Sequence, residues 1–330
     1  MHLLTVSNLY KRFNLEAGFF ARFGRFVNAV NDISFHIGKN EAYGLVGESG
    51  CGKTTTACLL VRMYESDSGE IIYNENEKPL NVAALKKDSL KQYREKVRYI
   101  FQDPARSLNP RLSVYEVLVS GSRKPLKQRG INEKQLREKA AAILEEVGLQ
   151  ASDLEKRPSE FSGGQRQRIS IARALLMEPE VLICDEVISA LDVSIQGQIL
   201  NLLLDIRKKR NISFLFIAHD LKVACYFCDR IGVMYKGELM EEAQAASLYK
   251  EAKHPYTKLL FSSAAGVEKE PDLQNHQKPV PPCDGSPNNC SFAPRCPQAT
   301  ERCFQEHPAL KEIGTGHSIR CFNYNSHKTT

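Results

Sequence analysis

The sequence lacks any apolar run close to the roughly 20 residues that a membrane-spanning helix needs. Its longest apolar run, residues 212–218, has the length of a buried strand. The first residues, MHLLTVSNLYKRF, also lack the long apolar stretch and the small-residue cleavage site of a signal peptide. These absences exclude a membrane-spanning subunit and predict a chain that stays in the cytoplasm.

The chain also has no large excess of positive or negative charge. The net charge is +6 over 330 residues, with 25% charged and 42% apolar residues, as in an ordinary soluble protein. A mixed, solvated surface accounts for this mild excess, and a basic patch for nucleic acid or anionic lipid is the alternative. No internal repeat is present. The length suits one large domain with a smaller one, or two domains.

Cysteines are sparse along most of the chain but crowd its last fifty residues. A cytoplasmic protein does not keep these as structural disulfides, so the cluster suggests a metal site. Four follow the spacing Cys290-x5-Cys296-x6-Cys303-x17-Cys321, and Cys283 lies outside it. Four thiolates suit an iron–sulfur cluster or Zn²⁺. The lack of C-x2–4-C pairs argues against zinc, and unligated thiols are the third alternative.

Residues 47–54, GESGCGKT, fit the phosphate-binding loop G-x-x-x-x-G-K-S/T. Glycines let the backbone turn tightly enough to aim several N–H groups at phosphate oxygens. Lys53 adds a positive charge near the terminal phosphates, and the Thr54 hydroxyl can ligate Mg²⁺. A short apolar strand precedes the loop and a helical run follows it, in the order that the site needs. The predicted nucleotide-binding residues here are Gly47, Glu48, Ser49, Gly50, Cys51, Gly52, Lys53, Thr54 and Thr55.

A second motif, VLICDE at residues 181–186, is an apolar strand that ends in two carboxylates. Open α/β sheets bind ligands at the carboxyl ends of their strands. Asp185 can hold the Mg²⁺ shell, and Glu186 can polarise an attacking water as a general base. The alternative is an acidic loop after a core strand, but the phosphate-binding loop upstream favours the functional interpretation.

A third motif, Ser162-Gly163-Gly164-Gln165, opens the helical run RQRISIARALL. A serine and two glycines at a helix start form a second anion-binding end. One nucleotide does not need two phosphate cradles, so we expect this one to complete a site on another subunit. An ordinary N-capped helix is the alternative, although such a helix would not require both glycines.

Strands and helices alternate along the first 265 residues. Apolar runs predict strands around residues 41–47, 96–103, 181–186 and 212–220, and helical periodicity predicts helices at 132–147, 162–177 and 194–210. This order predicts a mostly parallel sheet of the α/β class. Residues 268–287 contain five prolines and no apolar periodicity, which predicts a linker before a small, loop-rich domain.

Together these motifs resemble those of ATP-binding cassette (ABC) transporter ATPases, whose signature is SGGQ between the phosphate-binding loop and the Asp-Glu strand. Other family motifs match as well. Gln102 in YIFQDP matches the Q-loop, a Mg²⁺ ligand, and Asp192 in SALD matches the D-loop. His219 in FIAHD matches the switch histidine that senses the γ-phosphate, and Phe13 matches the aromatic residue that stacks on adenine.

The resemblance implies catalytic roles for Glu186, His219, Gln102 and Lys53, with ATP and Mg²⁺ as cofactors. It also implies a RecA-like P-loop core with antiparallel β and helical subdomains, the helical one at about residues 104–175. The nucleotide-binding domain would span residues 1–265, and a Pro-rich linker with a Cys-rich C-terminal domain would span 266–330. Val187 and Ile188 depart from the family, which usually has Pro or Ala after the glutamate. We expect altered loop stiffness there rather than lost chemistry.

Further segments are similar to the ATPases of oligopeptide and dipeptide importers, and especially to the second, F-type, subunit. These segments are SLNPRLSV, FSGGQRQR, SALDVSIQ, HPYTKLL and the tail motif Cys290-Ser-Phe-Ala-Pro-Arg-Cys296. In that group the tail resembles a region that binds a 4Fe–4S cluster, with Zn²⁺ as the alternative here. The resemblance implies a second ABC ATPase subunit, two transmembrane permease subunits and an extracytoplasmic solute-binding protein as partners, with no nucleic acid. It implies a peripheral location at the cytoplasmic face of the cell membrane. Transport of nickel or sugar, or a soluble non-transport ABC ATPase, are the alternatives.

Overall fold

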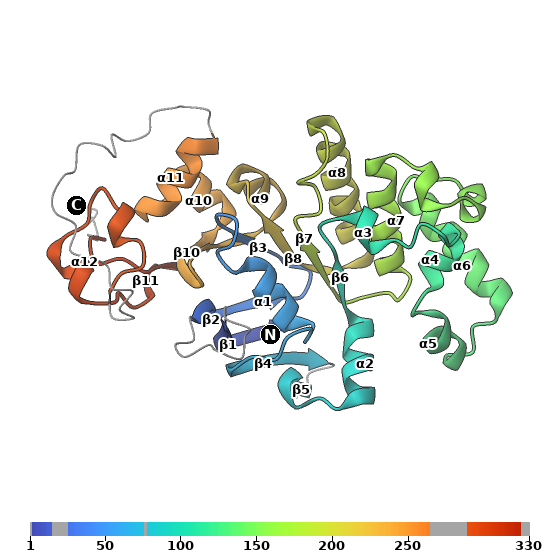
Figure 1. The fold of residues 1–330 in the computed structure, drawn as a ribbon, viewed down its shortest axis with the longest axis horizontal. Helices are drawn as coiled ribbons and strands as arrows, with labels where there is room; N and C mark the ends of the chain where they lie inside the picture. The colour runs from blue at the N-terminus through green and yellow to red at the C-terminus, as the bar shows by residue number, and fades with distance from the viewer. Residues whose placement is uncertain (1, 15–25, 76–77, 265–288, 325–330) are drawn as a thin grey trace, which may run out of the picture. The chain divides into compact units, whose positions relative to one another are not determined.

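The computed structural model describes residues 2–14, 26–75, 78–264 and 289–324 (Figure 1). The predicted Pro-rich linker and Cys283 lie outside these ranges. The chain divides into two compact units. The first comprises residues 1–3, 37–41 and 84–217, and the second comprises 4–36, 42–83 and 218–330.

The first unit contains three parallel strands in the order β8-β7-β6 (Figure 1). These strands are β6 (Val97–Ile100), β7 (Val181–Asp185) and β8 (Ser213–Ala218). Val181 lies opposite both Val97 and Ser213, which sets the register. Every residue of β7 and β8 is buried, as the apolar sequences of the two predicted strands indicate. Asp185 therefore ends a strand that packs in the core.

The remaining elements of the first unit are helical, and most lie between β6 and β7. The α-helices are α2 (Lys87–Lys96), α3 (Pro104–Ser107), α4 (Val114–Val119), α5 (Arg123–Gln128), α6 (Glu133–Glu146), α7 (Gly163–Leu175) and α8 (Val193–Arg210). Two 3-10 turns, η2 (Ala151–Glu155) and η3 (Pro158–Glu160), separate α6 from α7. Helix α6 begins at a capping box in which Asn132 and Gln135 each accept the other's backbone N–H. The helices predicted at residues 132–147, 162–177 and 194–210 are confirmed.

The second unit begins with an antiparallel sheet in the order β2-β1-β4-β5. Its strands are β1 (His2–Asn14), β2 (Phe26–Gly38), β4 (Ser68–Glu75) and β5 (Lys78–Asn81). This sheet is the antiparallel portion that the resemblance predicts near the N-terminus. The short turn η1 (Val82–Ala84) follows it.

A second run of strands in this unit has the order β11-β12-β10-β9-β3. Its members are β3 (Ala42–Val46), β9 (Arg230–Tyr235), β10 (Glu238–Gln244), β11 (Lys311–Gly314) and β12 (His317–Ile319). The helices of the unit are α1 (Lys53–Leu60), α9 (Leu221–Phe227), α10 (Ala245–Glu251), α11 (Pro255–Ala264), the 3-10 turn η4 (Ala293–Arg295) and α12 (Glu301–Gln305). Strands β3 and β9 are parallel, whereas β10, β12 and β11 continue from β9 in antiparallel order.

The α/β class predicted from the sequence is therefore right, and β6, β7 and β8, like β3 and β9, are parallel as expected. Strands β10, β12 and β11 add antiparallel pairs, so the strand arrangement is mixed. The mixed arrangement arises because β10 turns back on β9 through a short connection, and the C-terminal segment then adds β12 and β11 to its open edge. Within the described ranges, no helix combines the length and the apolarity needed to cross a membrane.

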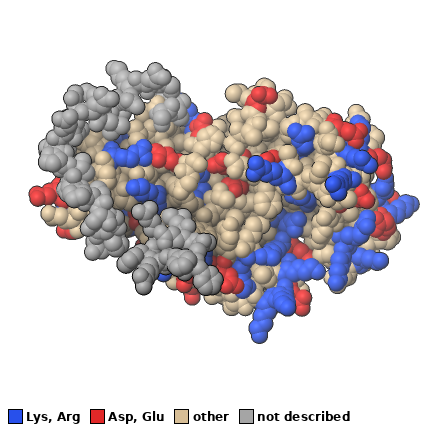
Figure 2. Space-filling view, viewed as in Figure 1, with Lys and Arg blue, Asp and Glu red and all other residues tan. Residues whose placement is uncertain are grey.

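Lys and Arg side chains gather over α2 and α5 on the face of the first unit shown in Figure 2. Arg129, just after α5, forms an ion pair of 2.7 Å with Glu95 of α2. Lys91 of α2 and residues of α5 line a hollow of about 680 Å³. Positive charge is thus locally concentrated on this face.

Candidate functional site

The phosphate-binding loop connects the buried strand β3 to α1, as the sequence predicts. Two of its glycines are required by their surroundings. A Cβ on Gly47 would collide with the carbonyl of Met234, and one on Gly52, whose φ is +107°, would collide with the carbonyl of Ala29. The loop therefore passes directly against neighbouring backbone. Ser49, Gly50 and Thr54 are exposed, and Thr55 is half-buried, so this stretch is accessible to a ligand.

Lys53 is only 3% exposed. Its ammonium donates hydrogen bonds to the carbonyls of Gly47, at 2.7 Å, and Glu48, at 3.0 Å. The charge is thus held over the start of the loop. Cys51 is buried beside it, and burial raises the pKa of the Cys51 thiol, which keeps it neutral.

Asp185 and Glu186 occupy the carboxyl end of β7, in the first unit. Asp185 is 3% exposed, and the Tyr99 hydroxyl donates to its Oδ2 at 2.5 Å. The Gln102 amide donates from Nε2 to Glu186 Oε2 at 2.8 Å. The structure therefore brings Gln102 and Glu186 together, and it adds Tyr99, whose role no sequence motif indicated. Hard oxygen donors such as the Asp185 carboxylate and the Gln102 amide suit Mg²⁺.

Helix α7 begins with the predicted signature. Ser162 is its N-cap: its Oγ accepts the Gln165 N–H at 3.3 Å, and Gln165 Oε1 accepts the Ser162 N–H at 2.9 Å. Packing within this chain favours a glycine at position 164, because an added Cβ would lie 2.6 Å from Ile195 Cγ2. The nearest atom to a Cβ on Gly163 is 3.7 Å away, in Leu191. Packing thus explains the glycine at position 164. The space beside Gly163 is open to a ligand.

The remaining predicted site residues belong to one unit or the other. Asp192, in the first unit, is exposed at the N-cap of α8. In the second unit, His219 is exposed after β8. Phe13 is half-buried and packs edge-on against Tyr64, with 5.3 Å between ring centroids. Tyr64 is 46% exposed, and this aromatic partner was not predicted.

The four tail cysteines lie in one neighbourhood and form no disulfide. The Cys290 N–H donates to the Cys303 carbonyl at 2.9 Å. Burial, with smaller contributions from the neighbouring thiols, raises the pKa of both Cys290 and Cys296 to about 11. Among the described residues, however, no group of three or more His, Cys, Asp and Glu side chains is arranged to hold a metal. The four thiols are thus near enough to influence one another electrostatically, but they are not arranged as a metal site.

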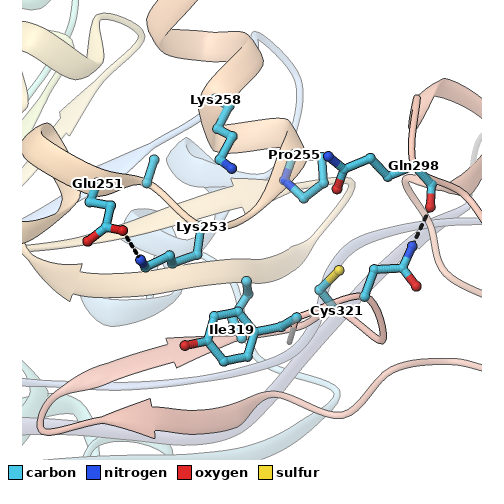
Figure 3. A pocket seen from close by; sticks show the side chains of 10 residues that line it. Glu251, Lys253, Pro255, Lys258, Gln298, Ile319 and Cys321 are labelled. Atoms are coloured by element: carbon cyan, nitrogen blue, oxygen red, sulfur yellow. Dashed lines mark hydrogen bonds and ion pairs between the residues drawn. The ribbon is translucent and has the colours of Figure 1, made fainter. Parts of the chain in front are cut away.

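Cys321 lines a hollow of about 390 Å³ between α11 and the tail (Figure 3). Lys253 pairs with Glu251 on its rim, and the Asn323 amide donates to the Gln298 carbonyl (Figure 3). Lys258 extends from α11 into the same hollow (Figure 3). One candidate cysteine is therefore reachable from the surface.

A glycine-rich phosphate loop after a buried strand, a paired Asp-Glu at a strand end and an SGGQ helix start define an ATP-binding cassette ATPase. The family described as "ABC transporter" matches residues 30–189, and that described as "Oligopeptide/dipeptide transporter, C-terminal region" matches residues 240–303. The chain belongs to the oligopeptide/dipeptide transporter ATP-binding proteins of the ABC family, and it is an ATPase. The resemblance seen in the motifs is confirmed.

Relatives cover the full chain. The oligopeptide transport ATP-binding protein AppF of Bacillus subtilis is 38% identical over 98% of this chain and 97% of its own length. The protein YkfD of the same organism is 40% identical over 99% of this chain and 97% of its own length.

Solved structures share the cassette fold. The structure of cbiO1 from Clostridium perfringens, part of the transporter complex cbiONQ, has a TM-score of 0.63 and 26% identity over 76% of this chain and 91% of its own. The dimeric cassette MJ0796, in a post-hydrolysis state bound to ADP and Pi, has a TM-score of 0.62 and 26% identity over 73% of this chain and 98% of its own.

Proposed function

We propose that this chain hydrolyses ATP to energise the uptake of oligopeptides or dipeptides by an ABC importer. Its ATPase function follows from its family, and the cargo class is supported by its similarity to AppF, which is named for oligopeptide transport. The observation that carries the catalytic role is the 2.8 Å hydrogen bond by which Gln102 orients the Glu186 carboxylate, one residue after the buried Asp185. An oriented carboxylate at a strand end is placed to act as a general base.

The predicted site residues take separate roles in this proposal. Residues Gly47–Thr55 would cradle the phosphates, with Lys53 adding its charge. Glu186 would take the proton of the attacking water, and His219 would sense the γ-phosphate. Phe13, supported by Tyr64, would stack on adenine. Residues Ser162–Gln165 and Asp192 would act toward the nucleotide of a second cassette.

Mg²⁺ would be held by Thr54, Gln102 and Asp185, whose hydroxyl, amide and carboxylate oxygens are the donors that this ion prefers. When bound, it would neutralise charge on the phosphates. The Tyr99 hydroxyl, at 2.5 Å from Asp185, holds that carboxylate in one orientation. This chain's own contribution is thus a pre-oriented ligand at the end of β7.

The proposed assembly contains a second ABC ATPase subunit, most simply in a heterodimer. Two permease subunits would change conformation when ATP closes the pair of cassettes. An extracytoplasmic solute-binding protein would deliver the cargo. Such an assembly holds the chain at the cytoplasmic face of the membrane. The proposed domain division, with a nucleotide-binding domain at residues 1–265, a helical subdomain at about 104–175 and a C-terminal domain from 266, is consistent with helices α3–α7 between β6 and β7.

Reconstituted transport tests this function. The chain is assembled with its second ATPase, permeases and binding protein in liposomes, and uptake of a labelled tripeptide and hexapeptide is measured with ATP. Uptake that disappears in Lys53→Ala supports the proposal. ATP-driven uptake of nickel or a sugar in place of peptide would overturn the assignment of peptide as the cargo. ATP turnover unaffected by Lys53→Ala would overturn the assignment of the ATP site.

We also propose that Cys290, Cys296, Cys303 and Cys321 bind a 4Fe–4S cluster, with Zn²⁺ as the alternative. The donor set fits, because four thiolates are the usual ligands of such a cluster and all four lie in one neighbourhood. The described conformation has no ready metal geometry, so the cysteine side chains would have to move when the cluster binds. The bound cluster would cross-link the tail.

A further inference from the structure

An ion pair joins the cysteine-rich tail to the phosphate-binding loop. Arg295 of η4 donates from Nη1 to Glu48 Oε2 and from Nη2 to Glu48 Oε1, both at 2.8 Å. Glu48 is the first residue after the glycine that opens the loop. The geometry is a two-bond fork, which fixes orientation as well as charge. The tail thus contacts the second residue of the loop directly.

An aromatic cluster beneath the pair holds Arg295 in place. Phe292, also in the tail, is 1% exposed and packs at 5.3 Å from both Tyr235 and Tyr256. The Arg295 guanidinium lies 5.7 Å from the Tyr235 ring centroid and 5.9 Å from that of Phe292. Rings at such distances attract a cation. Arg295 therefore does not reach the loop as an isolated, mobile surface side chain.

Glu48 is held from three sides. Its carboxylate pairs with Arg295, its N–H donates to the Tyr256 hydroxyl at 3.1 Å, and its carbonyl accepts from Lys53 at 3.0 Å. The hydrogen bond from Arg295, more than the nearby Lys53 charge, lowers the pKa of Glu48. Glu48 therefore carries a negative charge within the loop, and Arg295 is the group that compensates it.

We propose that Arg295 is a positioning residue for ATP binding: its fork to Glu48 neutralises that carboxylate and fixes the first turn of the phosphate-binding loop. This inference rests on the proposed role of the loop. Without Arg295, an uncompensated carboxylate stands next to the site of a polyanion and is free to move. The free-standing charge repels the phosphates, and the loop loses the one contact that fixes the Glu48 side chain, while its backbone bonds to Tyr256 and Lys53 remain. The tail therefore contributes to nucleotide affinity from outside the cassette motifs.

The test measures binding of a fluorescent ATP analogue with Mg²⁺ to the full chain. Arg295→Ala is expected to raise Kd about three- to tenfold, as loss of one partly exposed, two-bonded pair would do. In a Glu48→Gln background, where there is no charge to compensate, Arg295→Ala is expected to change Kd by less than about twofold. Arg295→Lys, which keeps the charge but not the fork, should lie between wild type and Arg295→Ala.

Arg302→Ala is the matched control, because Arg302 pairs with Glu306 in the same tail and the structure gives it no contact with the loop. It should leave Kd unchanged. Limited proteolysis follows the folding of the tail in every variant. If Arg295→Ala loosens the tail and Glu48→Gln does not restore affinity, the tail acts through its fold and the inference is overturned. Wild-type affinity in Arg295→Ala overturns it as well.

Lys53→Ala separates this inference from the proposed function. If Lys53→Ala also binds the analogue normally, the role of the loop fails. If Lys53→Ala loses binding while Arg295→Ala does not, the loop still binds the phosphates, and only the positioning role of Arg295 is overturned.

Discussion

At Glu186 the backbone adopts a left-handed conformation, with φ of 46°. Such a conformation is unfavourable for a residue with a side chain and persists only where the surroundings impose it. Here the N–H of Glu186 donates to Ile217 at 3.1 Å, and its carbonyl accepts from Ser189. Val187 and Ile188, the departure from the family pattern, are 1% and 6% exposed and anchor the next turn. The altered loop stiffness expected from this departure stays a prediction.

Glu186→Gln is expected to cut ATP turnover while sparing ATP binding. Loss of a general base lowers the rate about 10²- to 10⁴-fold, or roughly 3–5 kcal/mol of barrier. Turnover and analogue binding are measured in the assembled complex. Glu180→Gln is the matched control, because Glu180 precedes the same strand and pairs with Lys96. Near-normal turnover in Glu186→Gln would refute the catalytic role.

Single residues were predictable from the sequence where they belong to a contiguous motif. Lys53, Asp185 and the glycines of the loop are of this kind, since their spacing alone indicates the chemistry. Tyr99 and Arg295 were not predictable, because their partners lie 86 and 247 positions away in the chain. A lone tyrosine or arginine gives no sign of such a partner before the chain is folded.

At the scale of elements, β10 was the least predictable. Its sequence, ELMEEAQ, has three glutamates in seven residues, which indicates exposure, yet Glu238, Glu241 and Glu242 are 3%, 0% and 9% exposed. Each is buried with a partner from another segment: His307, His317 and Arg230, respectively. Buried carboxylates need such partners, and only the folded chain supplies them. The strands and helices with clear periodicity were predicted because their own residues supply the apolar face.

The attachment of the tail to β10 should weaken in acid. Burial alone would raise the pKa of Glu241, but hydrogen bonds from His317 and from the N–H groups of Lys253 and His254 outweigh it, and the pKa is lowered. Glu238 behaves likewise, through His307 and Ser291, with Asn31 and Arg320 also facing it. A carboxyl whose pKa is lowered by folding stabilises the fold above its ordinary pKa of about 4.3. That stability is lost as pH falls through the lowered value.

Hydrogen exchange of residues 289–324 between pH 3 and 7 measures this effect. Protection is expected to be constant near neutrality and to fall below about pH 4. Glu241→Gln should cost about 1–3 kcal/mol of local stability, since buried N–H donors lose an acceptor, and should blunt the acid response. Glu251→Gln, at an exposed carboxylate, is the control. An unchanged acid response in Glu241→Gln would contradict the assignment.

The tail cysteines are expected to bind an iron–sulfur cluster that stabilises a segment too small to hold a core by itself. Anaerobically purified protein should be brown, with near-stoichiometric iron and acid-labile sulfide. Replacing any one of the four cysteines by serine should bleach the protein and make the tail more sensitive to proteolysis. The Kd for ATP should rise by no more than it does in Arg295→Ala. Cys283→Ser should do neither. Colourless protein that contains zinc would keep the ligands and replace the metal, and metal-free protein with a well-folded tail would refute both.

At the scale of the whole molecule, the predicted site residues belong to both units. The phosphate-binding loop belongs to one, and Asp185, Glu186 and the α7 signature belong to the other. Within its own unit the signature serves the N-cap and the close packing of Gly164 on Ile195, whereas Ser162 and Gln165 are exposed and the position of Gly163 has room for a side chain. An exposed helix N-terminus with spare space suits an anion supplied by another subunit.

Gly163→Asp tests whether the signature acts on a second subunit. Aspartate in the first turn of α7 favours the helix through its dipole, so the folded chain should keep its thermal stability and its own ATP affinity. The same carboxylate would repel a phosphate brought by a partner, and dimerisation driven by ATP should be lost. The measurement is light scattering of the Glu186→Gln chain mixed with the second ATPase subunit, so that ATP bound to this chain's own catalytic site is not consumed, with and without Gly163→Asp. Gly197→Asp adds the same charge in the second turn of α8, where a Cβ meets nothing within 4 Å, and should leave the dimer intact. Loss of ATP binding by the Gly163→Asp monomer would instead show that the signature serves the nucleotide of its own chain.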